Sequence, residues 1–259
     1  MKLNQVLVVY KQVTDHKEHL ATLNELYELL KELGVSFEAQ STRQLQNIGN
    51  VDLVITVGGD GTVLATSHFV DEQPILGIKS FGKQSVGYFC AASRQTMKNY
   101  LRELIAKERE PIKLHRLQAE INGQKVAELA LNDVLFANSN PASMSRYEIS
   151  IGNKIEEQKS SGVWVSTAAG STAAVKAAGG KVLKLTSDKI EYFVREPYLM
   201  NGRYHMKRGV LSAKAVVKIT ALMPQGTVFI DGGATQYPAP TGAVVAIKNA
   251  KKQLNMYWR

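Results

Sequence analysis

The segment Val51–Ala65, VDLVITVGGDGTVLA, constrains the fold most, because it joins a buried strand to a helix through a glycine-rich turn. Its β-branched run Val54–Val57 is typical of a strand that is covered on both faces. Three glycines in the next four positions end the strand and let the backbone approach a ligand without Cβ clashes. A helix over Val63–Phe69 is expected to follow. The segment therefore predicts an α/β unit with a ligand site at a strand end.

The chemistry of this turn indicates phosphoryl transfer. A turn that opens onto a helix N-terminus directs N–H groups and the positive end of the helix dipole at one point, which suits phosphate. Asp60 lies in the middle of the turn. A carboxylate beside phosphate repels it unless it holds Mg²⁺ or another divalent cation, or takes a proton from an attacking hydroxyl. The alternative is an ordinary tight turn with Asp60 as N-cap. The spacing fits neither the Rossmann G-x-G-x-x-G fingerprint nor the Walker A pattern.

The first 110 or so residues alternate between strand and helix patterns. This alternation predicts a parallel sheet with helices on its faces and ligands at the carboxyl ends of the strands. The glycine-rich turn lies at such an end. The expected strands are Gln5–Tyr10, Val35–Ala39 and Pro74–Ile78, and the expected helices are Leu20–Leu33, ended by Gly34, and Ser93–Lys107, capped by Ser93.

After Pro111 the pattern changes to short apolar alternations that are separated by Asn-Gly, Gly-Asn and Ser-rich punctuation. This part is predicted to be β-rich, with one helical stretch near Ser171–Ala178. The expected strands include Leu117–Ile121, Val126–Val134, Tyr147–Ile151, Gly162–Ser166, Val210–Leu222, Val228–Ile230 and Val244–Ile247.

A pair of polar residues, Asn132 and Asp133, lies within the apolar stretch Val126–Val134. Adjacent side chains of a strand point to opposite faces, so at least one of the two needs a partner or a ligand if the strand is buried. A turn or bulge with an Asx hydrogen bond is the open alternative.

The segment Gly162–Ala174, GVWVSTAAGSTAA, predicts a strand, a turn of small residues and the start of a helix. It offers four hydroxyl groups and little side-chain bulk to keep a planar ring away. The alternative is a helix N-cap with a glycine and alanine packing contact. Asp231-Gly232-Gly233, further along, is a hairpin turn by its chemistry.

Composition limits the function classes. The chain has 259 residues, of which 44% are hydrophobic and 21% charged, as is usual for a globular protein, and no run approaches 18 apolar residues. Without a signal-peptide pattern either, a cytoplasmic protein that binds no membrane is expected. The net charge of +9 favours polyanionic ligands, and because the basic residues are spread along the chain, nucleotides or polyphosphate are expected rather than nucleic acid. The single cysteine, Cys90, excludes an intrachain disulfide and a cysteine cluster for zinc.

The sequence GGDGT followed by Val63-Leu64 resembles the NAD kinase signature. Diacylglycerol and sphingosine kinases share the GGDGT core but usually place Asn-Glu directly after it, so the NAD kinase branch is favoured. The resemblance implies a Rossmann-like parallel α/β domain, residues 1–109 plus 243–259, and a β-sandwich-like dinucleotide-binding domain, residues 110–242. It also implies that the last strand returns to the first domain.

The activity implied by the resemblance is transfer of the terminal phosphoryl group of ATP, or of polyphosphate, to the 2′-hydroxyl of the adenosine ribose of NAD, giving NADP. Asp60 would be the general base or organise Mg²⁺, and a homo-oligomer, dimer or tetramer, is implied. The donor phosphates would be bound by Gly58, Gly59, Gly61, Thr62 and Lys79, and the dinucleotide by Asn132, Asp133, Ser161, Thr172, Ala173 and Ala174.

Four positions depart from the family pattern. Asp133 replaces Glu, Ala174 replaces Tyr, Ser161 replaces Asp, and Lys79 replaces Asn in the longer segment Gly77–Phe89. These changes leave room for a rival interpretation, a catalytically weak sensor that binds NAD or another nucleotide. A lipid kinase of the same superfamily is the third possibility. Lys79 and Lys83 could both face phosphates, and Asp231-Gly232 resembles a late DG motif of the family.

Overall fold

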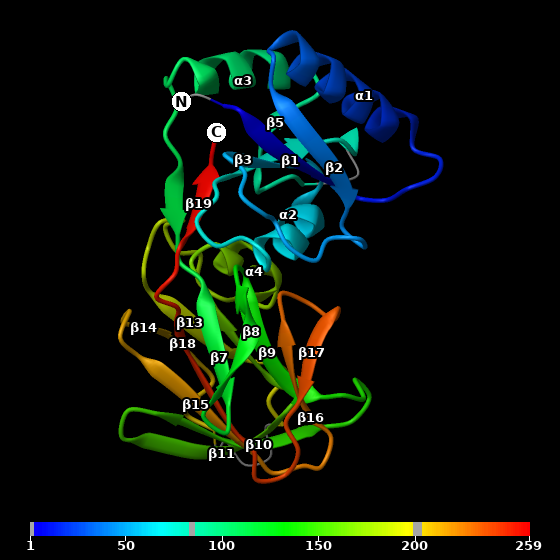
Figure 1. Ribbon diagram of the computed structural model, residues 1–259. Coiled ribbons are helices and arrows are strands. Elements are labelled where there is room, and N and C mark those ends of the chain that lie inside the picture. Colours follow the sequence, from blue (N-terminus) through cyan, green and yellow to red (C-terminus); the bar gives the residue numbers. More distant parts are fainter. Residues whose placement is uncertain (1–2, 83–85, 199–203) are drawn as a thin grey trace. The chain divides into compact units, whose positions relative to one another are not determined.

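The computed structural model describes residues 3–82, 86–198 and 204–259, and the chain divides into two compact units (Figure 1). The first unit comprises Met1–Lys113 and Leu254–Arg259, and the second comprises Leu114–Gln253. The segment that returns to the first unit begins at Leu254, eleven residues after residue 243, where the predicted return starts. The reason is that Val244–Asn249 pairs with two strands of the second unit.

The first unit is built on a parallel sheet. Its elements are β1 (Gln5–Tyr10), α1 (Lys17–Glu32), β2 (Ser36–Ser41), β3 (Leu53–Gly58), α2 (Asp60–Ser67), β4 (Ile75–Lys79), β5 (Cys90–Ser93), α3 (Met97–Ile105), β6 (Ile112–Leu114) and β19 (Leu254–Tyr257). The strand order is β2-β1-β3-β4-β19-β6, with β5 paired to β4. The pairs of β1 with β2 and β3, and of β4 with β3, β5 and β19, are all parallel, so the predicted α/β arrangement is confirmed.

The helices of this unit lie on its sheet as their apolar spacing predicts. Leu23, Leu26 and Leu30 recur along one face of α1 and are buried in a core that also contains side chains of α3. Figure 1 shows α1 and α3 on the same side of the strands. Gly34 has a φ of +67°, a left-handed conformation that costs glycine little and that follows the end of α1.

All three helices of this unit begin at other residues than expected, α1 three residues before Leu20. The helix expected from Ser93 begins at Met97, because Ser93 is the last residue of β5 and its N–H donates to Thr96 Oγ1 at 2.9 Å in a local turn. The helix expected from Val63 begins at Asp60, since the Gly59 carbonyl already accepts from the N–H groups of Thr62 and Val63.

The second unit is a β-sandwich. Its elements are β7 (Leu117–Ile121), β8 (Gln124–Ala130), β9 (Asp133–Asn138), β10 (Ser145–Ile151), β11 (Lys154–Ser160), β12 (Val163–Ser166), the 3-10 helix η2 (Gly170–Thr172), α4 (Ala174–Ala177), β13 (Ile190–Val194), β14 (Arg208–Leu211), β15 (Val216–Ala221), β16 (Gly226–Ile230), β17 (Thr235–Pro238) and β18 (Val244–Asn249). The two antiparallel sheets have the orders β11-β10-β15-β18-β7-β8 and β14-β13-β12-β9-β16-β17. Their inner faces share one core, in which the rings of Phe136 and Tyr147 meet edge to face at 5.5 Å.

The stretch Val126–Val134 is not one strand as predicted. Strand β8 ends at Ala130 and β9 begins at Asp133 in the opposite sheet, so Leu131 and Asn132 form the break between the two sheets. The predicted hairpin turn at Asp231–Gly233 is confirmed, because β16 and β17 pair on either side of it.

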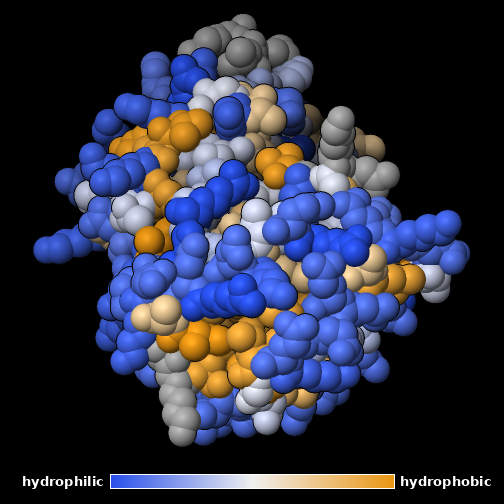
Figure 2. Space-filling view, turned by 90° about the horizontal axis from the view of Figure 1, so that it is seen from above, coloured by the Kyte–Doolittle hydropathy of each residue, from blue (hydrophilic) through white to orange (hydrophobic). Residues whose placement is uncertain are grey.

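The surface of the α1 and α3 side is largely hydrophilic, with apolar side chains gathered in several places (Figure 2). In the part of the chain that is described, no helix combines the length and the apolar character that crossing a membrane requires.

Candidate functional site

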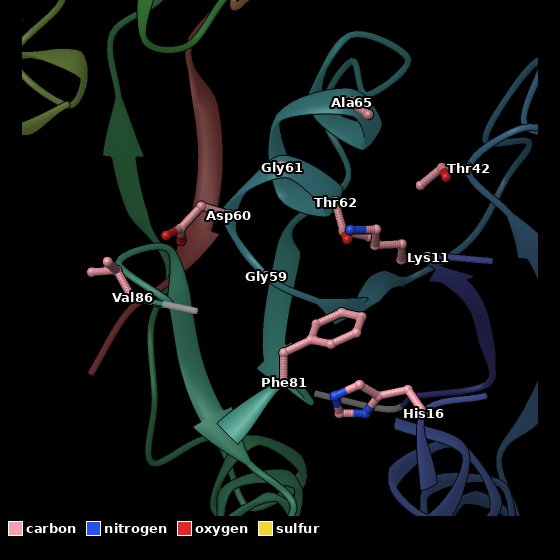
Figure 3. Close-up of a pocket in the computed structure, with 10 residues that line it drawn as sticks. All are labelled: Lys11, His16, Thr42, Gly59, Asp60, Gly61, Thr62, Ala65, Phe81 and Val86. Carbon is pink, nitrogen blue, oxygen red and sulfur yellow. The ribbon is translucent and has the colours of Figure 1, made fainter. Parts of the chain in front are cut away.

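The glycine-rich turn borders a cavity of about 670 Å³ in the first unit (Figure 3). The cavity lies at the carboxyl ends of β1 and β3, where ligands bind in parallel sheets. It is lined by Lys11, His16, Thr42, Gly59, Asp60, Gly61, Thr62, Ala65, Phe81 and Val86. The structure thus brings together four of the residues that the sequence predicts, Gly59 to Thr62.

The glycines of the turn have different roles. A Cβ atom at Gly58 would lie 2.1 Å from Thr62 Oγ1, so any side chain at this position would clash with Thr62 in the observed turn. A Cβ atom at Gly61 would meet nothing within 4 Å, so here the missing side chain leaves the backbone open. Gly58 is therefore needed for close packing against Thr62 within the turn, and Gly61 leaves the backbone of the turn accessible to a ligand.

The carboxylate of Asp60 is held in place by the main chain. Its Oδ1 atom accepts a hydrogen bond from the N–H of Phe89 at 2.8 Å. Figure 3 shows this carboxylate on the Val86 side of the turn, whereas Lys11 extends toward Thr62. The cavity thus offers a fixed carboxylate and a separate cation.

Six of the ten lining residues were not predicted from the sequence, and three of these have side chains that contact one another. Lys11 directly follows β1, and its Nζ lies 5.2 Å from the centre of the Phe81 ring. The His16 ring meets the Phe81 ring edge-on at 4.8 Å. Lys11 could have been found from its position, because it stands at the carboxyl end of a parallel strand. His16 and Phe81 carry no such signal.

One histidine beside this wall is closed off from solvent. His19 is 1% exposed, stacks on Phe81 and lies with its Nδ1 2.7 Å from Ser80 Oγ. Burial lowers the pKa of His19, which favours the neutral ring that stacks on Phe81.

Lys79 does not line this cavity. Its side chain instead runs beside Gly87, where a Cβ atom would lie 2.8 Å from Lys79 Cδ. Lys83, the other lysine considered in this segment, lies outside the described residues.

A second cavity, of about 380 Å³, lies in the second unit and contains four of the six residues predicted to bind the dinucleotide. It is lined by Asn132, Asp133, Leu135, Trp164, Ala173, Ala174, Phe229, Asp231, Gly232 and Gly233. Ala174 stands where the family pattern has Tyr, so a smaller side chain lines this part of the cavity than the pattern implies. Thr172 is not among the lining residues, and its hydroxyl donates to the Ala169 carbonyl at 3.0 Å.

One carboxylate accepts hydrogen bonds from the N–H groups at the break between β8 and β9. Asp231 accepts hydrogen bonds from the N–H groups of Leu131 at 2.8 Å, Asn132 at 2.6 Å and Asp133 at 3.1 Å. Asp231 itself has a φ of +51°, a left-handed conformation that aspartate tolerates better than most residues. The late DG motif is therefore the anchor of the Asn132 segment.

In the polar pair, Asp133 is buried and Asn132 is half-buried, and both line the second cavity. Asn132 Oδ1 is buried and has no hydrogen-bond partner among the described residues. Asp133 is 8% exposed, and its burial, followed by the nearby Asp231 carboxylate, raises the pKa of Asp133 to about 7. An acceptor atom without a partner in a cavity wall is available to a bound molecule.

The small-residue turn Ser166–Ala174 packs directly on this break. Thr167 donates from its hydroxyl to the Leu131 carbonyl at 2.6 Å and from its N–H to the Asn132 carbonyl at 2.9 Å. A Cβ atom at Gly170 would lie 2.0 Å from the Asn132 carbonyl oxygen. The small residues are therefore required for close packing of two backbones as well as for an open cavity.

Ser161 lines a third cavity, of about 390 Å³, with Arg195 and Glu196. This cavity shares Leu135 and Phe229 with the second one, so the two are neighbours on the same sheet.

The two halves of the chain match two family models. Residues 4–109 match the ATP-NAD kinase N-terminal domain, and residues 131–258 match the ATP-NAD kinase C-terminal domain.

Named relatives match along most of this chain. It is 31% identical to the NADH kinase of Arabidopsis thaliana over 265 residues, which cover 93% of this chain and 84% of the relative. It is 30% identical to the NAD kinase of Methanospirillum hungatei over 207 residues, covering 77% and 71% respectively.

Two solved structures share the fold. An NAD kinase from Archaeoglobus fulgidus, in complex with ATP, matches with a TM-score of 0.80 at 24% identity, over 98% of this chain and 93% of that one. A yeast NADH kinase in complex with NADH matches with a TM-score of 0.84 at 16% identity, over 99% and 84%.

Proposed function

The chain belongs to the ATP-NAD kinase family and is a phosphotransferase, and from this premise we propose how its two cavities divide the reaction. In this proposal the cavity of the first unit takes the donor phosphates of ATP, and the second takes the adenosine part of NAD. The terminal phosphoryl group passes to the 2′-hydroxyl of the adenosine ribose, and the products are NADP and ADP. The observation that carries the proposal is the placement of Asp60, Lys11 and the N-terminus of α2 around one cavity.

The donor side is supported by its charges. The first N–H groups of α2 carry the positive end of the helix dipole, and Lys11 adds a full positive charge. The N–H of Thr62 donates to the Gly59 carbonyl at 3.0 Å, so Gly61 is the better candidate for direct phosphate contact. Positioning and neutralisation of phosphate are what phosphoryl transfer needs most from a protein.

The acceptor side is supported by the polar pair Asn132 and Asp133. The Asn132 amide oxygen lacks a partner among the described residues and suits a hydroxyl or an exocyclic amine of the nucleoside. The small side chain of Ala174 in the cavity wall leaves space for a planar ring. Ser166 and Thr167 do not contribute hydroxyls to the ligand in this proposal, because both donate to backbone carbonyls.

The reaction needs one proton acceptor, for which we propose Asp60. As the 2′-oxygen forms its bond to the terminal phosphorus, the bond from phosphorus to the bridging oxygen of ADP breaks, and the hydroxyl proton passes to the Asp60 carboxylate. The Phe89 N–H fixes this carboxylate and so lowers the cost of orienting it.

The residues fit Mg²⁺ as a cofactor that is shared with the substrate. No cluster of three or more His, Cys, Asp or Glu able to hold a metal is found among residues 3–82, 86–198 and 204–259. Mg²⁺ is usually held by one or two carboxylates together with substrate phosphates, and Asp60 would supply the carboxylate. When bound, the ion neutralises phosphate charge.

The test is an end-point assay of the purified chain with NAD, ATP and Mg²⁺, read by an NADP-specific dehydrogenase. NADP is expected from the unmodified chain, and Asp60→Asn is expected to lower its rate by about 10²–10⁴-fold, the usual worth of a positioned acid or base. The variant keeps an oxygen for the Phe89 N–H, so its melting temperature should not change. Near-normal turnover in the folded variant would contradict the role of Asp60. Replacing ATP by polyphosphate in the same assay identifies the donor.

A further inference from the structure

The N–H group that fixes the proposed proton acceptor belongs to a tight turn at the start of β5. The Phe89 N–H donates to Asp60 Oδ1 at 2.8 Å, and Figure 3 shows this carboxylate on the side of Val86, the residue before the turn. The turn is closed by the Cys90 N–H, which donates to the Gly87 carbonyl at 3.2 Å. Cys90 is the first residue of β5, so the N–H of Phe89 is not oriented by a partner strand. Its direction depends on what holds the turn.

Strand β4 supports the turn on one side. A Cβ atom at Gly77 would lie 2.6 Å from the Phe89 carbonyl oxygen and 3.0 Å from Cys90 Cα, so the turn packs directly on the backbone of β4. The register between β4 and β5 shifts after Gly77, which interrupts the regular ladder beside the turn. Packing of this kind blocks movement toward β4, but it does not prevent rotation of the peptide groups within the turn.

One guanidinium group holds both ends of the turn. Arg259 lies two residues after the end of β19. It donates from Nη2 to the Gly87 carbonyl at 2.6 Å and from Nε to the Cys90 carbonyl at 3.3 Å. A guanidinium group is planar and presents its donors in a fixed fork. It therefore fixes the relative direction of the two carbonyls, between which the Phe89 N–H lies.

The residue before Arg259 anchors this clamp to the first unit. The Trp258 ring meets the rings of Tyr88 and Phe89 edge-on, with centroids 5.0 Å and 6.4 Å apart. The Trp258 carbonyl accepts a hydrogen bond at 2.8 Å from the hydroxyl of Tyr100, a buried residue of α3. The main chain that leads into Arg259 is thus tied to the core, and the Arg259 side chain reaches the turn from a fixed base.

We propose that Arg259 is a positioning residue for phosphoryl transfer, because it orients the Phe89 N–H and this N–H orients the Asp60 carboxylate. The proposal rests on the proposed function, in which Asp60 accepts the proton of the attacking hydroxyl. Arg259 is exposed and is not among the residues that line the donor cavity, so it acts on the carboxylate through the turn. Without the fork, the N–H takes more directions, and the carboxylate spends less time in the geometry that takes the proton.

The test measures kcat and both KM values of Arg259→Ala in the assay with NAD, ATP and Mg²⁺. We expect kcat to fall about tenfold or more, since a misplacement of about 1 Å can cost about 10²-fold in rate. The KM values for ATP and NAD should not change, because no substrate contact is lost. Guanidinium ion at millimolar concentration should restore part of the lost kcat by binding between the two carbonyls. Arg259→Lys keeps the charge but lacks the fork, so it should also recover only part.

Two further variants test the route of the effect. If Arg259 acts through Asp60, adding Arg259→Ala to Asp60→Asn should cost no further kcat, since the group that it positions is already gone. Arg109→Ala is the matched control. Arg109 lines the same surface cavity as Arg259, but it pairs with Glu103 at 2.6 Å and lies over the Tyr100 ring at 4.1 Å. Its removal should leave kcat unchanged.

The outcomes separate the inference from the proposed function. A normal kcat in Arg259→Ala, or the same further loss when it is added to Asp60→Asn, would overturn the inference while the proposed function stands. A rise of both KM values together with a lower melting temperature would also overturn it, because Arg259 would then only support the fold. If Asp60→Asn itself turns over normally, the role of Asp60 fails and the inference fails with it.

Discussion

The carboxylate of Asp231 accepts a hydrogen bond of 2.6 Å from the backbone N–H of Asn132, which lies 99 residues earlier in the chain. The same carboxylate also accepts from Leu131 and Asp133, so one side chain binds three consecutive N–H groups at the break between β8 and β9. The main chain of the polar pair Asn132 and Asp133 is therefore held by the turn between β16 and β17 as well as by its own strand.

Asp231→Ala is expected to destabilise the fold by about 1–3 kcal/mol, because it leaves buried N–H groups without an acceptor. The KM for NAD should rise, while the KM for ATP should stay the same. Thermal unfolding measures the loss of stability, and initial rates at varied NAD and ATP concentrations measure the two KM values. Asp231→Asn keeps one acceptor oxygen, so its stability and its KM for NAD should lie between those of the unmodified chain and those of Asp231→Ala. A normal KM for NAD in Asp231→Ala would contradict the positioning role.

The raised pKa of Asp133, about 7, predicts how stability depends on pH. In the unfolded chain this carboxyl has an ordinary pKa near 3.8, so between about pH 4 and pH 7 the native state binds more protons than the unfolded state. The free energy of unfolding should then fall as pH rises through this range, by at most about 1.4 kcal/mol per pH unit, and level off above pH 7.

Asp133→Asn removes this titration and serves as the comparison. The variant should gain stability relative to the unmodified chain between pH 4 and pH 7, with no further gain above pH 7. Urea unfolding at a series of pH values measures the difference. A constant difference across the range would show that Asp133 titrates normally.

The same substitution at Gly58 and at Gly61, two glycines of one turn, is expected to have different effects. Gly58→Ala places a methyl group 2.1 Å from Thr62 Oγ1, and we expect a lower melting temperature and loss of activity. Gly61→Ala meets nothing within 4 Å, so it should keep the melting temperature but raise the KM for ATP by narrowing the approach to the backbone. Equal KM values for ATP in Gly61→Ala and the unmodified chain would place the phosphates elsewhere.

Lys11 is predicted to bind donor phosphate. Lys11→Gln should raise the KM for ATP about tenfold or more, since a charge-assisted hydrogen bond is worth about 1.5–3 kcal/mol. The effect should shrink at high salt, and the KM for NAD should not change. Lys98→Gln is the control, because Lys98 is half-exposed and pairs with Glu32 at 3.6 Å on the helix surface. A similar KM change in both variants would indicate a general charge effect.

The sequence by itself determined the class of fold, the turn and the family. Strand and helix periods, three glycines around Asp60 and the GGDGT core are local properties, and local backbone preferences and burial patterns encode them in neighbouring residues. The same reasoning placed the break after Ala130 inside one strand, because Leu131 is as apolar as a strand interior. The polar pair that follows left a turn open as an alternative, but no local pattern shows that β9 crosses to the other sheet.

Only the tertiary structure decided which distant residues share a cavity. Lys11 and Phe81 lie on the same cavity wall because parallel strands end at one edge, and Asp231 reaches Asn132 because β16 pairs with β9. The tertiary structure also places Lys79 outside the cavity of the glycine-rich turn, and Ser161 in a different cavity from Asn132 and Asp133. The physical reason is that register and strand order, which depend on how the whole core packs, set the direction in which each side chain points.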